Sequence, residues 1–236
     1  MIQIKKNHNH RIKKMAGHET INSRGSSNYI IHSKDCPLNP QINILGDFFR
    51  DTMNELLGEL HNIVIKLPQK PIYEISTKIT SPYDIDDPER PVLDIIINSN
   101  GGDGEILKSM YTILDIAKAR GAIVRTTVIG AARSCGSLLA IAGTPGFRLM
   151  GELSSHYIHY GSGRIFATND LEAREKANQM RLGKKHTLSK YEEYTKIPKK
   201  NLTKYLQHEI GEIPAEKCLE WYICDWIISK TGFKTR

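Results

Sequence analysis

The sequence contains no apolar run long enough to cross a lipid bilayer. Its longest apolar stretches, such as residues 92–97, are far shorter than the roughly 20 residues that a membrane-spanning helix needs. The N-terminus is also too polar for a secretory signal peptide. These absences predict a soluble, intracellular, cytoplasmic protein with no membrane partner.

Cysteine is scarce as well. The spacings of the four cysteines match neither a zinc ribbon nor a dense disulfide framework. We therefore expect free thiols in a reducing compartment and no bound metal. The sequence also lacks the G-x-x-x-x-G-K-S/T phosphate loop, so ATP would have to be hydrolysed by a partner. No organic cofactor is expected. The cysteines are Cys36, Cys135, Cys218 and Cys224.

Positive charge exceeds negative charge, and most of the excess lies near the N-terminus. The formal net charge is +7, and residues 1–40 hold seven Lys or Arg against two acidic residues, so +5 of it falls there. A basic segment with little periodicity is typical of a flexible or partner-ordered tail. We predict such a tail at residues 1–40 and one domain at residues 41–236, with nucleic-acid tethering by the tail as the less favoured alternative.

Apolar strands alternate with helical patterns after this tail. Alternation of this kind predicts an α/β fold with a mainly parallel sheet, in which active residues gather at the carboxyl ends of the strands. The predicted strand and helix pairs are residues 42–46 and 48–64, 93–97 and 105–120, and 123–129 and 137–142.

Three further segments complete the pattern. Residues 68–91 hold five prolines and are interpreted as an insertion or long loop with at most one hairpin. Residues 170–194 are charged and permit a helix, which predicts a long projecting helix that packs against a partner. A C-terminal helix at 215–222 is expected to lead into a strand at 223–228.

The run from Gly130 to Ser137 carries the most informative pattern in the chain. It places Ser134 among small residues, after a β-branched strand and before a helix rich in Ala and Leu. The unpaired N–H groups and the dipole at a helix N-terminus favour the negative charge that forms when a serine attacks a carbonyl. His159 follows Ser134 by 25 residues. Together they predict a serine nucleophile and its base.

The spacing of these residues resembles that of the proteolytic subunit of the Clp protease (ClpP), a self-compartmentalised serine peptidase. The similarity is strongest from Val128 to His159 and weaker elsewhere between about residues 40 and 230, with one insertion near 68–91. The matching patterns are Gly130-x-Ala132-x-Ser134-x-Gly136, Ala142-Gly143-x-x-Gly146-x-Arg148, Ile158-His159 and, upstream, Asn98-Ser99-x-Gly101-Gly102.

The resemblance implies a fold, a site and an assembly. The fold would be the ClpP/crotonase type, with repeated ββα units and a projecting long helix. Ser134 would be the nucleophile, His159 the base, and the amides of Gly102 and Cys135 the oxyanion hole. The chain would form stacked homo-oligomeric rings, heptameric in the family, and degrade polypeptides with an ATP-dependent unfoldase as a possible partner.

The third member of the catalytic triad is where the sequence departs from the family pattern. An aspartate is expected before the final helix, but counting from Thr195 places Glu209 there, and counting back from Ala215 places Ile210. We favour Glu209, with Glu212 as the alternative. Two other departures are Asn100 in place of proline and Cys135 in place of methionine, and neither removes a backbone donor.

Two rivals to an active peptidase stay open from the sequence. If Glu209 and Glu212 are both surface charges, the chain would be a catalytically weak or inactive ring subunit with a scaffold or regulatory role. A crotonase-type enzyme acting on an acyl-thioester would share the fold and the oxyanion geometry. No thioester pocket is visible in the sequence, and the Ser134 and His159 pair argues against this second rival.

Overall fold

The computed structural model describes the chain from residue 13 onward, with gaps. The described residues are 13–15, 18–22, 28–32, 39–48, 50–74, 79–85, 87–161, 166–208 and 211–236. Its strands are β1 (Lys13–Met15), β2 (His18–Asn22), β3 (Asn28–His32), β4 (Gln41–Leu45), β5 (Val92–Ser99), β6 (Ile123–Arg133), β7 (Arg148–Gly151), β8 (Ser155–Tyr157), β9 (Ile213–Pro214), β10 (Trp226–Ser229) and β11 (Gly232–Lys234). Its helices are α1 (Arg50–Lys66), α2 (Gly104–Ala119), α3 (Cys135–Ile141), α4 (Asp170–Tyr194), α5 (Lys199–His208) and α6 (Ala215–Glu220).

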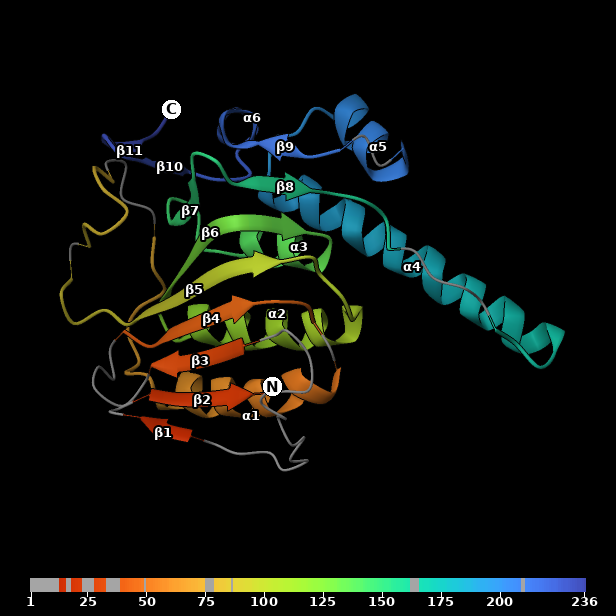
Figure 1. Cartoon of the computed structure of the whole chain (residues 1–236), viewed down its shortest axis with the longest axis horizontal. Coiled ribbons are helices and arrows are strands. Elements are labelled where there is room, and N and C mark those ends of the chain that lie inside the picture. The colour runs from red at the N-terminus through yellow and green to blue at the C-terminus, as the bar shows by residue number, and fades with distance from the viewer. Residues whose placement is uncertain are drawn as a thin grey trace, which may run out of the picture.

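A single mixed sheet runs through these parts of the chain (Figure 1). Its strand order is β1-β2-β3-β4-β5-β6-β7-β10-β11, and β8 and β9 continue it from the end of β6. The central strands β4 to β7 and β10 are parallel, whereas β1 to β3 and β11 are joined antiparallel. The predicted α/β class is confirmed, and the antiparallel edges are an addition to it.

Strands β1 to β3 lie inside the segment predicted to be a tail. The backbone of β3 pairs antiparallel with β4, and β2 and β1 follow in turn. The difference has a physical reason, because β4 would otherwise expose an unpaired edge and residues 29–31 are the strand formers Tyr, Ile and Ile. The domain boundary at residue 40 stays a prediction.

Helices α1, α2 and α3 lie next to one another on one face of the sheet, with α2 and α3 against its parallel strands (Figure 1). Their buried side chains contribute to the main core. Helix α2 presents an apolar stripe to this core, and the Asp103 side chain caps its first turn by accepting from the Glu105 N–H at 2.7 Å. In β5 the buried residues alternate with half-buried ones, as in a strand covered mainly on one face. The sheet therefore holds the carboxyl ends of β5 and β6 side by side.

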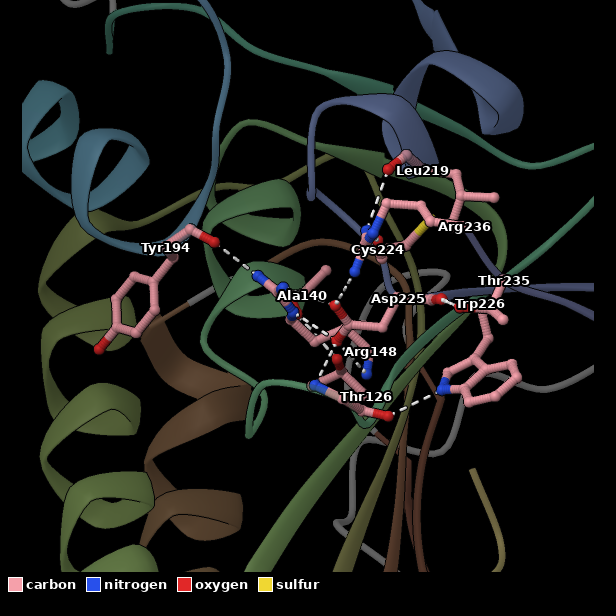
Figure 2. A network of polar contacts seen from close by, with 11 residues as sticks. Thr126, Ala140, Arg148, Tyr194, Leu219, Cys224, Asp225, Trp226, Thr235 and Arg236 are labelled. Atoms are coloured by element: carbon pink, nitrogen blue, oxygen red, sulfur yellow. Dashed lines mark hydrogen bonds and ion pairs between the residues drawn. The ribbon is translucent and has the colours of Figure 1, made fainter. Parts of the chain in front are cut away.

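Helix α4 extends away from the sheet, and along its length only Tyr191 is buried (Figure 1). Its C-terminal end is fixed by Arg148, whose Nη1 donates to the Tyr194 carbonyl at 2.6 Å (Figure 2). The same guanidinium forms a two-point ion pair with Asp225, which directly precedes β10, with both bonds at 2.8 Å. A cation at this position suits the partial negative charge of a helix C-terminus.

The described parts of residues 68–91 contain no helix or strand. Their apolar side chains pack against a small buried cluster of Val92, Ile123 and Phe147. Arg90 fixes this segment to the end of α2, since its Nη1 donates to the carbonyls of Pro71 and Gly121. The Tyr73 ring meets the Phe147 ring edge-on at 5.5 Å. The segment is thus a loop, without the hairpin that its sequence allows in those parts.

Candidate active site

Ser134 occupies the turn between β6 and α3. Its φ of 51° and ψ of −120° place a residue with a side chain in a region that few such residues adopt. The turn is held because the Ser134 N–H donates to the Tyr157 carbonyl at 2.9 Å, while the Leu138 N–H donates to the Ser134 carbonyl at 3.1 Å. Backbone strain of this kind costs about 1 to 3 kcal/mol and persists where the surroundings enforce it, often at reactive sites.

The glycine pair after β5 packs directly against this turn. Gly101 has a φ of 98°, and a Cβ there would lie 2.6 Å from the Ser134 Cβ and 2.9 Å from the Cys135 nitrogen. Gly102 has a φ of 138°, and a Cβ there would lie 2.4 Å from the Phe48 carbonyl oxygen. Both positions therefore require glycine, which brings this backbone close to the nucleophile turn.

The predicted nucleophile, base and oxyanion residues line one cavity. It has a volume of about 310 Å³ and lies between α2, α3 and α4, with Ser134, His159, Gly102 and Cys135 all on its wall. His159 is half-buried just beyond β8, and its ring centroid lies 5.5 Å from that of Tyr157. Three segments that are distant in the sequence thus contribute to a single concave site.

Cys135 connects the two turns that form this site. Its thiol donates to the Gly102 carbonyl at 3.2 Å, and the side chain is buried. Burial raises the pKa of the Cys135 thiol, so the group stays protonated and is a poor nucleophile. This supports Ser134 over Cys135 as the attacking group. Cys218 and Cys224 are likewise buried free thiols, and Cys36 lies outside the described residues.

The two candidates for the third triad position differ in what the structure describes. Glu209 lies outside the described residues. Both carboxylate oxygens of Glu212 accept hydrogen bonds. Arg133 donates to Oε1 through Nε and Nη2, and Ser155 donates to Oε2 at 2.8 Å. The hydrogen bond from Arg133, and next that from Ser155, lower the pKa of Glu212. Arg133 also donates to Asn100 at 2.9 Å, so the family departure at that position is part of the same cluster.

A family model described as Clp protease matches residues 51–231, which is most of the sequence. The chain belongs to the Clp protease family. No curated protein matches it. Members of this family are serine peptidases, and Clp proteases generally form rings that work with unfoldases.

Sequence reasoning missed three buried polar residues next to this Clp protease site. Tyr191 donates to Ser137 at 2.8 Å, and Ser137 lies 2.8 Å from His156 Nδ1, with each residue at most 1% exposed. The signal that would have found His156 is strand alternation, because Ser155 and Tyr157 on either side are only half-buried. Nothing in the local sequence marks Tyr191 as the partner of Ser137.

Two further features of this Clp protease chain bear on metal binding and on membrane insertion. Within the described residues, no group of three or more His, Cys, Asp and Glu side chains is placed to bind a metal ion. In the same residues, no helix combines the length and the apolarity that crossing a membrane requires.

Proposed function

We propose that this chain is a ClpP-like serine endopeptidase that degrades peptides or unfolded polypeptides. The observation that carries the proposal is the shared cavity lined by Ser134, His159, Gly102 and Cys135. The strained conformation of Ser134 and the two glycines packed against its turn support it further. Membership of the Clp protease family supplies the reaction class.

The proposed mechanism uses groups of this chain alone. His159 takes the proton of the Ser134 hydroxyl as Ser134 attacks the peptide carbonyl, and it returns the proton to the leaving amine. The amides of Gly102 and Cys135 would hold the oxyanion, and one such donor lowers the barrier by about 3 kcal/mol. Water then attacks the acyl-enzyme and releases the second product. Glu209 is the proposed orienting group for the His159 ring.

The proposed assembly follows the family. Repeated ββα units of the ClpP/crotonase type would form rings, heptameric by resemblance, that stack to enclose the cavities in a chamber. Helix α4 would join the rings, because a 25-residue helix with one buried side chain has most of its surface left for a partner. An ATP-dependent unfoldase would deliver substrates, and the compartment would be the cytoplasm.

The test is the intact mass of the protein after reaction with a fluorophosphonate probe. We expect one adduct on the wild type and none on Ser134→Ala, since only an activated serine reacts at a useful rate. Ser109→Ala serves as the matched control, because it removes an exposed serine hydroxyl of α2 that does not line the cavity, and we expect it to be labelled. An unlabelled wild-type protein in its assembled state, or equal labelling of Ser134→Ala, would contradict the proposal.

The second candidate function is a catalytically weak or inactive ring subunit. It is favoured by the Glu212 carboxylate, which is held by Arg133 and Ser155 instead of being left to orient an imidazole. The same probe separates the two functions. Assembly into rings without labelling of Ser134 is the result expected of a scaffold subunit.

A further inference from the structure

A hydrogen-bonded chain of three buried side chains lies beneath the candidate site. The Tyr191 hydroxyl donates to Ser137 Oγ at 2.8 Å, and Ser137 Oγ lies 2.8 Å from His156 Nδ1. Ser137 is fully buried, and His156 and Tyr191 are each 1% exposed. We call Tyr191, Ser137 and His156 the positioning chain.

The hydrogen bonds of the positioning chain have one direction. The Tyr191 hydroxyl donates a hydrogen bond to Ser137 Oγ, so the Ser137 hydroxyl in turn donates one to His156 Nδ1. His156 Nδ1 is therefore an acceptor, and the neutral imidazole carries its hydrogen on Nε2. Burial, followed by the charge of Arg148, lowers the pKa of His156 to about 3. Burial also raises the pKa of the Tyr191 hydroxyl. All three members therefore stay neutral near neutral pH.

Each member belongs to a different element of the site. Ser137 is in α3, three residues after Ser134, and His156 is in β8, three residues before His159. Tyr191 is the buried residue of α4, which extends away from the sheet. The positioning chain thus joins the helix of the nucleophile, the strand of the base and the projecting helix.

This connection matters because the turn at Ser134 is strained and α3 is only seven residues long. A strained turn keeps its shape only when its surroundings over-determine it. The backbone bond from Ser134 N–H to the Tyr157 carbonyl is one restraint between α3 and β8. The positioning chain is a second restraint between them, and buried hydrogen bonds of this kind are rigid when every member is satisfied.

We propose that Tyr191, Ser137 and His156 are positioning residues that fix Ser134 relative to His159 and make the seating of α4 a determinant of the reaction rate. The proposal rests on the proposed function of Ser134 as a nucleophile. Positioning acts on the reaction rate more than on binding, because a displacement of 1 Å at reacting atoms can lower the rate about 100-fold.

The experiment measures fluorophosphonate labelling of Ser134 at several probe concentrations, which separates the maximal rate from the probe affinity. The variants are Tyr191→Phe, Ser137→Ala and their double mutant, and the control is Thr126→Val. Thr126 also donates a buried hydroxyl hydrogen bond to α3, to the Ala140 carbonyl at 2.7 Å, but at the opposite end from Ser134 (Figure 2). The control therefore loses a similar bond without touching the positioning chain.

We expect each single variant to label about tenfold more slowly at saturation, with the probe affinity changed less than twofold. The double mutant is expected to be no slower than the slower single, because both changes break one chain. The loss is expected to be the same from pH 6 to pH 8, since no member titrates there. Thr126→Val should label at the wild-type rate after a similar fall in melting temperature.

Wild-type rates in Tyr191→Phe and Ser137→Ala would overturn the positioning role and leave the proposed function standing. An equal loss in Thr126→Val, or additive losses in the double mutant, would also overturn it by showing general destabilisation. A wild type that does not label overturns the proposed function, and the positioning role with it. If Tyr191→Phe fails to fold, Ser137→Ala decides the question alone.

Discussion

At the scale of single residues, the open question of the site is which carboxylate orients His159. We predict that Glu209→Gln lowers the maximal rate of peptide hydrolysis at least about 100-fold, because the His159 ring would lose its proposed orienting group. Glu212→Gln is the matched control, and its expected loss is below about threefold, since Arg133 and Ser155 already hold that side chain. Steady-state kinetics on a fluorogenic peptide measures both, and the reverse order of losses would identify Glu212 as the orienting group.

The buried His156 predicts how stability depends on pH. Its pKa is about 3 in the folded protein against 6.5 in the unfolded chain, so between these values the unfolded chain binds one more proton. Stability therefore falls as the pH drops through this window, by about 1.4 kcal/mol per pH unit for this group. The expected loss between pH 7 and pH 5 is about 2 kcal/mol.

Urea denaturation at pH 7 and pH 5 measures this loss in the wild type and in His156→Gln. The variant has lower stability at pH 7, but its stability should fall by about 2 kcal/mol less between the two values because it has no imidazole to protonate. Asp225, whose pKa is lowered in the folded protein, titrates below pH 5 and so does not contribute to the difference between pH 7 and pH 5. Equal pH dependence in both proteins would show that His156 is not the group responsible.

The candidate site could be predicted from the sequence only in the part that depends on local spacing. Ser134 and His159 are 25 residues apart and follow the ends of β6 and β8, which pair in parallel, so their shared cavity follows from the arrangement of these elements. The positioning chain needs Tyr191 from a helix that begins after His159, and no local pattern encodes that contact. The ion pair of Arg133 and Glu212 could not be predicted from the sequence for the same reason, since 79 residues separate its members.

At the scale of elements, the apolar runs predicted the parallel strands and their helices well and the edges of the sheet poorly. The strand expected at 223–228 begins only at Trp226. Tyr222 has a φ of 59°, and the N–H groups of Ile223 and Cys224 both bond the Cys218 carbonyl, so the chain turns after α6 before it extends. An apolar run indicates buried residues, and here the buried residues belong to the turn that ends α6 as well as to β10.

The pair of Arg148 and Asp225 anchors the end of α4, and this predicts a large cost for breaking it. Burial alone would raise the pKa of Asp225, but the hydrogen bonds and charge of Arg148 outweigh it and lower that pKa. We expect Asp225→Ala to reduce the free energy of unfolding by about 3 to 5 kcal/mol, because Arg148 is left charged and buried without its counter-charge and keeps only the Tyr194 carbonyl as an acceptor.

Chemical denaturation measures this cost, with Glu220→Ala as the matched control. Glu220 forms an ion pair with Lys217 at 2.8 Å, but both side chains are exposed, so we expect a loss below about 1 kcal/mol. Losses of equal size in the two variants would mean that burial does not increase the contribution of the Arg148 and Asp225 pair to the free energy of unfolding. A small loss in Asp225→Ala would also contradict the role assigned to the pair in Figure 2.

At the scale of the whole molecule, charge is distributed unevenly around the proposed assembly surface. Residues 176–190 of α4 contain five Lys or Arg residues and no acidic residue, while acidic residues occur at both ends of the helix. The same helix exposes Leu171 and Leu182, which are 68% and 52% accessible. Apolar contact would therefore favour the pairing of two α4 helices, and like charge would oppose it.

This balance predicts that assembly through α4 strengthens as salt rises. Between about 50 and 500 mM salt the screening length falls from roughly 14 to 4 Å, which weakens repulsion between facing basic residues. Sedimentation velocity should show larger species at the higher salt. Arg181→Gln, which removes one charge from α4, should assemble at lower salt than the wild type, and Lys230→Gln, which removes one exposed charge elsewhere, should not. Dissociation on adding salt would instead show that ion pairs with an acidic surface hold the subunits together.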